Sequence, residues 1–254
     1  MKVAVIGAGN VGSQLAAELI RNGAEVVFGA RNPSSEKTQA AVAAVPGSKA
    51  LTTAEAADWC TALILAIPGM TTQEQYNACA ASLGAGAAGK VVIDATNPLS
   101  AFPSLEVYWD GNTSGGEMCS EAFSNSSVFK AFNTIGREHM GIGADGRGIP
   151  GYDAAAGPLS MLFAGDKGKE SEAAAVVKAA GFSPRYVGPI RYARNLEAIG
   201  ELWIHAAVPP AGFTKENWGR QFHFQVVGST SGAAAAPESK LATPAVEVAA
   251  VSGV

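Results

Sequence analysis

Cysteine, histidine and charged residues are all scarce in this chain of 254 residues. It contains three cysteines, three histidines and 16% charged residues. Cys60, Cys79 and Cys119 are widely separated, which argues against both a cysteine-based metal site and a disulfide framework. We therefore expect free, mostly buried thiols, a site without a metal, and a cytoplasmic location.

Long apolar runs and an excess of positive charge are also missing. No run of about 18 apolar residues occurs, so the sequence predicts no transmembrane helix and no membrane partner. The apolar run at the N-terminus is short and breaks into glycines, unlike a secretory signal. The net charge of -4 gives no indication of a large basic surface, so we expect no nucleic-acid partner.

What the chain does contain is a regular alternation of short apolar runs and helical segments. This alternation is typical of a doubly wound parallel sheet, so the predicted fold class is α/β, of the Rossmann type. The predicted strands are 2–6, 25–28, 50–51, 62–67, 91–94, 128–131, 161–164 and 185–187, and the predicted helices are 10–22, 36–44, 54–60, 71–82, 170–180 and 191–207.

The same pattern suggests how the chain is divided. We predict a Rossmann domain over residues 1–136 and a small C-terminal α/β extension over 137–228. Residues 229–254 are dominated by Ala, Pro, Ser and Gly and are predicted to form a flexible tail. Two segments rich in Gly, Ser, Asn and Pro, 97–125 and 141–158, are expected to be long loops.

The link between the first predicted strand and helix reads GAGNVG and matches the G-x-G-x-x-G pattern. Gly7 would allow a tight turn, Gly9 would let the backbone approach a pyrophosphate, and Gly12 would let the helix pack closely on the strand. The N-terminus of the helix would offer free N–H groups to the phosphates. This setting predicts dinucleotide binding, and the alternative is a glycine turn in an α/β domain without a ligand.

The end of the second strand predicts which dinucleotide binds. NAD-specific folds have an acidic residue there, which accepts hydrogen bonds from the adenosine ribose. This chain has Gly-Ala-Arg31-Asn32, with Ser34, Ser35 and Lys37 just beyond. A guanidinium can bind a 2′-phosphate that an acid would repel, so the sequence favours NADP(H). The alternative is that Arg31 is a solvated surface residue.

Other strand ends should meet near the nicotinamide, because ligands bind beyond the carboxyl ends of parallel strands. Pro68 can shape a turn against the cofactor, and Asn97 and Asn133 can bind the carboxamide or a second substrate. Each asparagine also has a purely structural interpretation, because Asx turns are common at strand ends. The residues in question are Ala66, Ile67 and Pro68 after the fourth strand, Asn97 after the fifth and Asn133 after the sixth.

Several motifs, in order along the chain, resemble the family of deazaflavin (coenzyme F-420)-dependent NADP oxidoreductases. They are GAGNVG, GARNP, DATNPL, TSGGE, VFKAFNT, FAGD and GPIRYARNLEAIGELWI, and the resemblance runs from about Met1 to Val227. The KAFN stretch is closer to the nucleotide-binding domain of the Steap ferric reductases. The aromatic segment 209–228 matches no deazaflavin contact.

The resemblance implies a Rossmann fold with a small C-terminal extension and hydride transfer between NADP(H) and a deazaflavin or flavin. It implies that Asn97 and Asn133 lie near the nicotinamide, as catalytic residues. The implied cofactor-binding residues are Gly7, Gly9, Asn10, Val11, Gly12, Arg31, Asn32, Ala66, Ile67, Pro68, Asn97 and Asn133.

The second substrate stays open between several classes. Hydride transfer to a flavin-like ring such as coenzyme F-420, FMN or FAD needs positioning rather than an acid–base pair. The alternatives are reduction of a small carbonyl, imine or ferric chelate, and a non-catalytic NADP-binding sensor.

A carbonyl or imine reductase would need a proton donor, for which Lys130, Tyr192, His139 and His205 are the candidates. Tyr108 and Trp109 are candidates for a stacking lid, whereas Trp203 is expected in the core. The polar side of the last predicted helix, with Glu201 and His205, is interpreted as a solvated face, a cleft lining or a homodimer interface.

Overall fold

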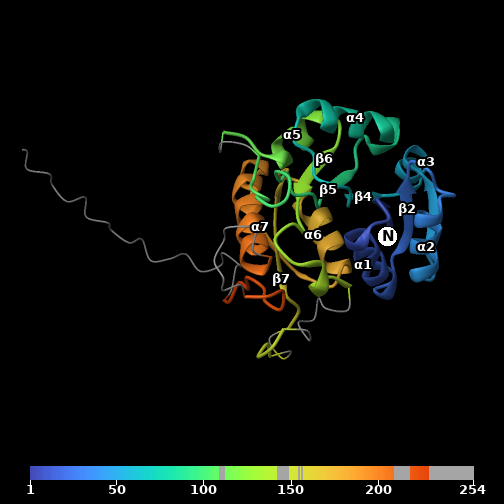
Figure 1. Cartoon of the computed structure of the whole chain (residues 1–254). Helices are drawn as coiled ribbons and strands as arrows, with labels where there is room; N and C mark the ends of the chain where they lie inside the picture. The colour runs from blue at the N-terminus through green and yellow to red at the C-terminus, as the bar shows by residue number, and fades with distance from the viewer. Residues whose placement is uncertain (109–111, 142–148, 154, 156, 209–217, 229–254) are drawn as a thin grey trace, which may run out of the picture.

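The computed structural model describes the chain except for residues 109–111, 142–148, 154, 156, 209–217 and 229–254. One eight-stranded sheet in the order β3-β2-β1-β4-β5-β6-β7-β8 forms the centre of the molecule (Figure 1). Strands β1 to β6 are all parallel, as the alternation predicted. The strands are β1 (Lys2–Ile6), β2 (Glu25–Ala30), β3 (Lys49–Thr52), β4 (Ala62–Leu65), β5 (Val91–Asp94), β6 (Ser127–Lys130), β7 (Ser160–Gly165) and β8 (Ser183–Gly188).

Helices cover both faces of this sheet. Side chains of α1, α2 and α6 pack in the core on one face, and side chains of α3, α4 and α5 pack in the core on the other. In Figure 1, α7 lies at the opposite side of the molecule from α2 and α3. The helices are α1 (Asn10–Arg21), α2 (Glu36–Ala44), α3 (Thr53–Trp59), α4 (Gln73–Leu83), α5 (Gly115–Ala122), α6 (Glu170–Ala179) and α7 (Ala193–Ala207), with short 3-10 turns η1 (Gly84–Ala87), η2 (Arg137–His139) and η5 (Ile190–Tyr192).

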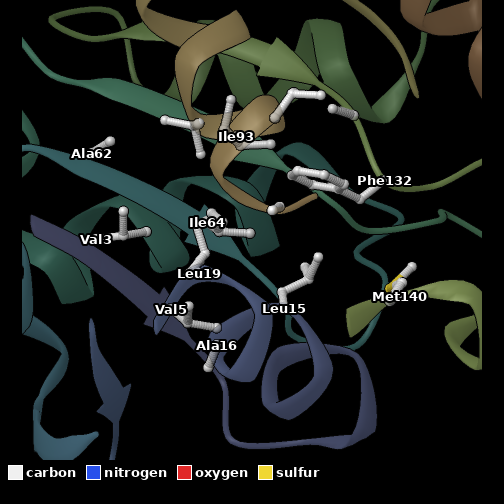
Figure 2. Close-up of a cluster of buried hydrophobic side chains, with 14 of the residues drawn as sticks. Val3, Val5, Leu15, Ala16, Leu19, Ala62, Ile64, Ile93, Phe132 and Met140 are labelled. Carbon is white, nitrogen blue, oxygen red and sulfur yellow. The ribbon is translucent and has the colours of Figure 1, made fainter. Parts of the chain in front are cut away.

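The first strand shows why the fold needs two hydrophobic layers. Successive side chains of a strand point to opposite faces. Val3 and Val5 accordingly pack against Leu15 and Leu19 of α1, as Figure 2 shows, whereas Ala4 and Ile6 belong to the core on the other face. Burial on both faces explains why this strand is an unbroken apolar run rather than an alternating one.

The C-terminal extension continues the same sheet, and one of its strands runs in an unexpected direction. Strand β7 is antiparallel to β6, with Lys130 opposite Ala164, and β8 is parallel to β7. The predicted doubly wound parallel sheet is confirmed for β1 to β6, and the antiparallel pairing of β6 with β7 was not predicted. The predicted domain boundary at residue 136 falls immediately before η2, and the tail predicted at 229–254 lies outside the described residues.

The segment expected to be a loop between residues 97 and 125 contains a helix instead. Helix α5 begins after Ser114, whose side chain accepts a hydrogen bond from the Glu117 amide and donates one to the Glu117 carboxylate. A serine followed three residues later by a glutamate is a helix-start pattern, so the sequence did carry this signal. Within the residues that the structure describes, no helix has the length and apolarity needed to span a lipid bilayer.

Candidate functional site

A cleft of about 1220 Å³ lies at the carboxyl ends of the parallel strands. It is lined by the segments that follow β1, β2, β4 and β5, together with one residue of η2. Topological switch points of this kind, where crossovers leave in opposite directions, are the usual ligand sites of open α/β sheets. The sequence-predicted residues that line the cleft are Gly7, Gly9, Asn10, Val11, Arg31, Asn32, Ala66, Ile67, Pro68 and Asn97.

The glycine loop after β1 has the geometry of a phosphate cradle. Gly7 has φ +109°, and a Cβ added there would lie 2.4 Å from the Ala66 carbonyl oxygen. Gly12 does not line the cleft, and a Cβ added there would lie 2.1 Å from the Gly7 carbonyl oxygen, so only glycine lets α1 pack this closely on the loop. Helix α1 has neither a side-chain cap nor an acidic residue in its first turn. Its first N–H groups are therefore suited to an anion.

The end of β2 presents cations to the same cleft. Arg31 and Lys37 are both exposed and line it, together with the half-buried Ser35, which caps α2. Asn32 shapes the turn between them, because its Oδ1 accepts hydrogen bonds from the Ser34 amide and hydroxyl, both at 3.2 Å. This arrangement fits a 2′-phosphate and offers no carboxylate to a ribose diol.

Asn97 and Asn133 come together although they follow different strands. The Asn133 side-chain amide donates to Asn97 Oδ1 at 3.2 Å, and the Asn97 side-chain amide donates to the Asn133 carbonyl at 3.2 Å. Asn133 also donates to the Leu196 carbonyl at 2.9 Å. Asn97 lines the cleft, whereas Asn133 is 3% exposed and lies behind it. Asn133 thus holds Asn97 in place.

Helix α7 forms the wall behind this asparagine pair. A Cβ added to Gly200 would lie 2.8 Å from the Asn133 carbonyl oxygen and 2.8 Å from Asn97 Oδ1. The absence of a side chain at Gly200 therefore lets the helix backbone support both asparagines. Sequence reasoning missed this residue, because a glycine within an apolar helical stretch carries no local sign of what it packs against.

A buried ionic cluster connects the same helix to the sheet. Lys130 Nζ lies 2.8 Å from Asp94 Oδ2 and 2.9 Å from Glu197 Oε1, and all three side chains are fully buried. Glu197 also accepts hydrogen bonds from the amides of Gly115 and Gly116 at the start of α5. Asp94 accepts from the amide and hydroxyl of Thr96, next to Asn97. The cluster therefore fixes the loop that carries Asn97.

The electrostatics of this cluster oppose proton exchange. Burial by itself lowers the pKa of Lys130, but the carboxylates of Asp94 and Glu197 outweigh it and raise the pKa above its ordinary value. Burial raises the pKa of Glu197, and the nearby Lys130 ammonium acts against that rise. A fully buried lysine held charged by two carboxylates is a structural cation and not a proton donor to a ligand.

The proton-donor candidates named from the sequence are wrong for this cleft, since none of them lines it. Besides the buried Lys130, His139 is 1% exposed and its Nε2 lies 2.7 Å from the Arg220 carbonyl oxygen. His205 contacts the Ser104 and Leu105 carbonyls through Nε2. Tyr192 is exposed and packs its ring over Gly188.

The aromatic residues are divided between core and surface. Trp203 is buried as predicted and stacks on Phe222, with ring centroids 5.3 Å apart. Its indole N–H donates to the Phe222 carbonyl, so the chain at Phe222 packs against α7. Tyr108 is 60% exposed and does not line the cleft, and Trp109 lies outside the described residues.

The polar side of α7 is partly covered by a loop. The Glu201 side chain accepts a hydrogen bond from the Val107 amide. Together with the His205 contacts above, this covers part of the polar side of α7 with a loop.

Arg137 lines the cleft and was not predicted. It is the first residue of η2 and follows the loop that contains Asn133. A single arginine after an asparagine-containing loop resembles many surface arginines, so no sequence pattern indicates its place in the cleft. Gln75, Cys79 and Ser82 of α4 also line the cleft without having been predicted.

Comparisons with known proteins give one family match and one curated relative. Residues 2–98 match the family model described as NADP oxidoreductase, coenzyme F420-dependent. The metalloreductase STEAP3 of Rattus norvegicus is 28% identical over 199 residues, which cover 78% of this chain and 36% of the relative. This chain therefore spans about a third of the length of that curated relative.

Solved structures share the fold over a longer range. A proposed F420-dependent NADP reductase from an Arthrobacter species is 24% identical, with a TM-score of 0.72 over 90% of this chain and 100% of the other. A hypothetical protein from Sinorhizobium meliloti is 20% identical, with a TM-score of 0.64 over 90% and 96% of the two chains. An imine reductase from Myxococcus stipitatus, solved with NADP+, is 15% identical, with a TM-score of 0.55 over 80% and 61%.

The family match supports NADP(H) binding and similarity to NADP-dependent oxidoreductases, and the solved structures support the Rossmann-type fold. The uncapped helix, the glycine cradle and the basic end of β2 fit that cofactor on their own geometry. The resemblance found in the sequence is therefore confirmed, and residues 2–98 of this chain match the coenzyme F420-dependent NADP oxidoreductase family.

Proposed function

We propose that this protein is an NADP(H)-dependent oxidoreductase that exchanges a hydride with a flavin-like second substrate, such as a deazaflavin, FMN or FAD. The observation that carries the proposal is the composition of the cleft wall around Asn97. That wall includes Ala66, Ile67, Pro68, Met70, Ala95 and Thr96, most of which are apolar. An apolar wall suits a planar ring stacked on the nicotinamide.

Each part of the cleft has a separate role in this proposal. The glycine loop and the start of α1 would hold the pyrophosphate, and Arg31, Ser35 and Lys37 would hold the 2′-phosphate. Asn97, supported by Asn133, would orient the carboxamide. Bound NADPH supplies the hydride from its nicotinamide ring, so the reaction needs alignment of two rings and one proton from water. Such alignment supplies on the order of 7–11 kcal/mol in favourable cases.

The described lining residues also favour this reaction over carbonyl reduction. Reduction of a carbonyl or imine requires a proton to be delivered to the reacting oxygen or nitrogen. In the part of the cleft that the structure describes, the titratable lining residues are Arg31, Lys37, Cys79 and Arg137. Burial raises the pKa of the Cys79 thiol to about 11, which makes it a poor acid.

The test is NADPH oxidation followed at 340 nm with a panel of acceptors. The panel contains coenzyme F-420, FMN, FAD, riboflavin, a ferric chelate, a small ketone and a cyclic imine. We expect turnover with the flavin or deazaflavin members. Turnover confined to the ketone, the imine or the ferric chelate would contradict the proposal and favour that substrate class. Tight NADPH binding with no turnover would favour a non-catalytic sensor.

A further inference from the structure

The loop after β6 presents one cation to the cleft from a rigid base. Every residue from Val128 to Gly141 is buried except Arg137 and Glu138. The preceding loop is held by Asn133, which bonds to Asn97 and to α7. Arg137 lines the cleft, and its side chain is 48% exposed. Because the backbone of this loop is already ordered, a ligand that binds Arg137 does not have to order the loop as well.

The charge of Arg137 is only partly neutralised by its neighbour. Arg137 Nε lies 3.6 Å from Glu138 Oε1, whereas Arg220 Nη1 lies 2.8 Å from the same oxygen. Two guanidinium groups therefore share one carboxylate, and Arg220 holds it at the shorter distance. The remaining positive charge faces a cleft whose described lining residues include no Asp or Glu.

The phosphates of the dinucleotide already have partners elsewhere in the cleft. Arg31 follows β2 and Arg137 follows β6, four strand positions away in the sheet. At about 4.8 Å per strand, β2 and β6 are roughly 19 Å apart, which separates the loop that carries Arg137 from the 2′-phosphate site proposed at Arg31. The pyrophosphate has the uncapped start of α1. Arg137 is thus a cation at the Asn97 end of the cleft with no group of NADP(H) assigned to it.

We propose that Arg137 binds an anionic group, a phosphate or a carboxylate, of the second substrate. This inference rests on the proposed function and narrows the substrate class to hydride acceptors or donors that carry such a group beyond their ring. A guanidinium binds either group with two parallel hydrogen bonds, which would also set the orientation of the ring over the nicotinamide.

The test compares acceptors that share a ring and differ in the phosphate. FMN and riboflavin form one pair, and coenzyme F-420 and its phosphate-free deazariboflavin fragment form the other. Each compound is titrated into the protein saturated with NADP+, and its binding is followed by the fluorescence of its ring. Each compound is also tested as an acceptor by measuring the oxidation of NADPH. The proteins are the wild type, Arg137→Ala, Arg137→Lys and the control Lys49→Ala, whose exposed lysine lies at the start of β3.

We expect the wild type to bind the phosphorylated member of at least one pair more tightly. In Arg137→Ala, the affinity for the phosphorylated member should fall by about 10- to 100-fold, the range for a charged hydrogen bond. The affinity for the phosphate-free member should stay the same. Arg137→Lys should recover part of the preference, and Lys49→Ala should retain all of it. NADPH affinity should be the same in all four proteins.

Several results would overturn the inference. They are equal binding within both pairs, a preference that survives in Arg137→Ala, binding of none of the four compounds, and a parallel loss of NADPH affinity. The proposed function fails separately, when no flavin or deazaflavin oxidises NADPH. Turnover of riboflavin without any preference for FMN would leave the function standing and reject the role of Arg137.

Discussion

Asn97 and Asn133 are joined by two hydrogen bonds of 3.2 Å, and Gly200 of α7 lies against both of them. Asn97, which lines the cleft, is therefore positioned by Asn133, which does not line it. It is also positioned by helix α7, which begins about 100 residues later in the chain.

Replacing Gly200 with alanine should disturb catalysis more than cofactor binding. The added Cβ would come within 2.8 Å of Asn97 Oδ1 and force the pair to move. Because a misplacement of about 1 Å can reduce a rate by about 100-fold, we expect kcat to fall by about tenfold or more. NADPH affinity should change by less, because the phosphates bind elsewhere. Leu202→Ala, at an exposed position of the same helix, is the control and should leave kcat unchanged. Unchanged kcat in Gly200→Ala would contradict the positioning role.

Arg31→Glu should change cofactor preference. The guanidinium would be replaced by a carboxylate that repels a 2′-phosphate and can accept from a ribose hydroxyl. Loss of a charged hydrogen bond corresponds to about 10- to 100-fold weaker NADPH binding, with NADH binding unchanged or improved. Titration of both nucleotides by fluorescence measures this, with Lys49→Glu as the control. An equal loss for NADPH and NADH would show that Arg31 does not contact the 2′-phosphate.

Lys130→Met should destabilise the protein severely. It leaves the carboxylates of Asp94 and Glu197 buried without their cation. Breaking a buried ion pair from one side costs about 3–5 kcal/mol of unfolding free energy, which urea denaturation can measure. The triple variant Lys130→Met, Asp94→Asn, Glu197→Gln removes the charges together and should recover part of that loss. A change below about 1 kcal/mol in the single variant would mean that the cluster is less important for stability than its burial indicates.

His223 should make the fold sensitive to acid. Burial lowers its pKa from 6.5 to about 4, and its Nε2 lies 2.8 Å from the Ser160 carbonyl oxygen. The folded state therefore keeps His223 neutral, and its stability is fully present above pH 6.5. Stability should decline as the pH falls from 6.5 towards 4, by at most about 3 kcal/mol. His223→Gln keeps a donor for Ser160 and should flatten the stability profile in this range. Parallel profiles for the two proteins would exclude this origin.

The half of the cleft that is expected to hold the phosphates could be predicted because its residues are local in sequence. Gly7, Gly9 and Gly12 lie within six residues, and Arg31 follows the next strand, so strand and helix periodicity places them at one sheet edge. Strand β1 and helix α2 were even predicted with the bounds that the structure shows.

The other half depends on contacts between distant parts of the chain. From the sequence, Lys130 was a candidate proton donor. The structure places Glu197, 67 positions later in the chain, beside it, and this contact makes Lys130 a buried structural cation. Nothing local distinguishes Arg137 and Gly200: the fold brings Arg137 to the cleft and packs Gly200 against Asn97 and Asn133. The reversal between β6 and β7 was missed for the same reason, because strand direction is not encoded in apolar periodicity.

The basic lining of the cleft has a consequence for the speed of binding. The chain as a whole carries a net charge of -4, yet the charged side chains among the described lining residues are Arg31, Lys37 and Arg137. Such a separation of charge gives a negatively charged molecule a local field that attracts it only near the cleft entrance. Polyanionic nucleotides would then be guided to the correct face during diffusion. The rate of encounter would depend on ionic strength and not on the contacts that form after the nucleotide has bound.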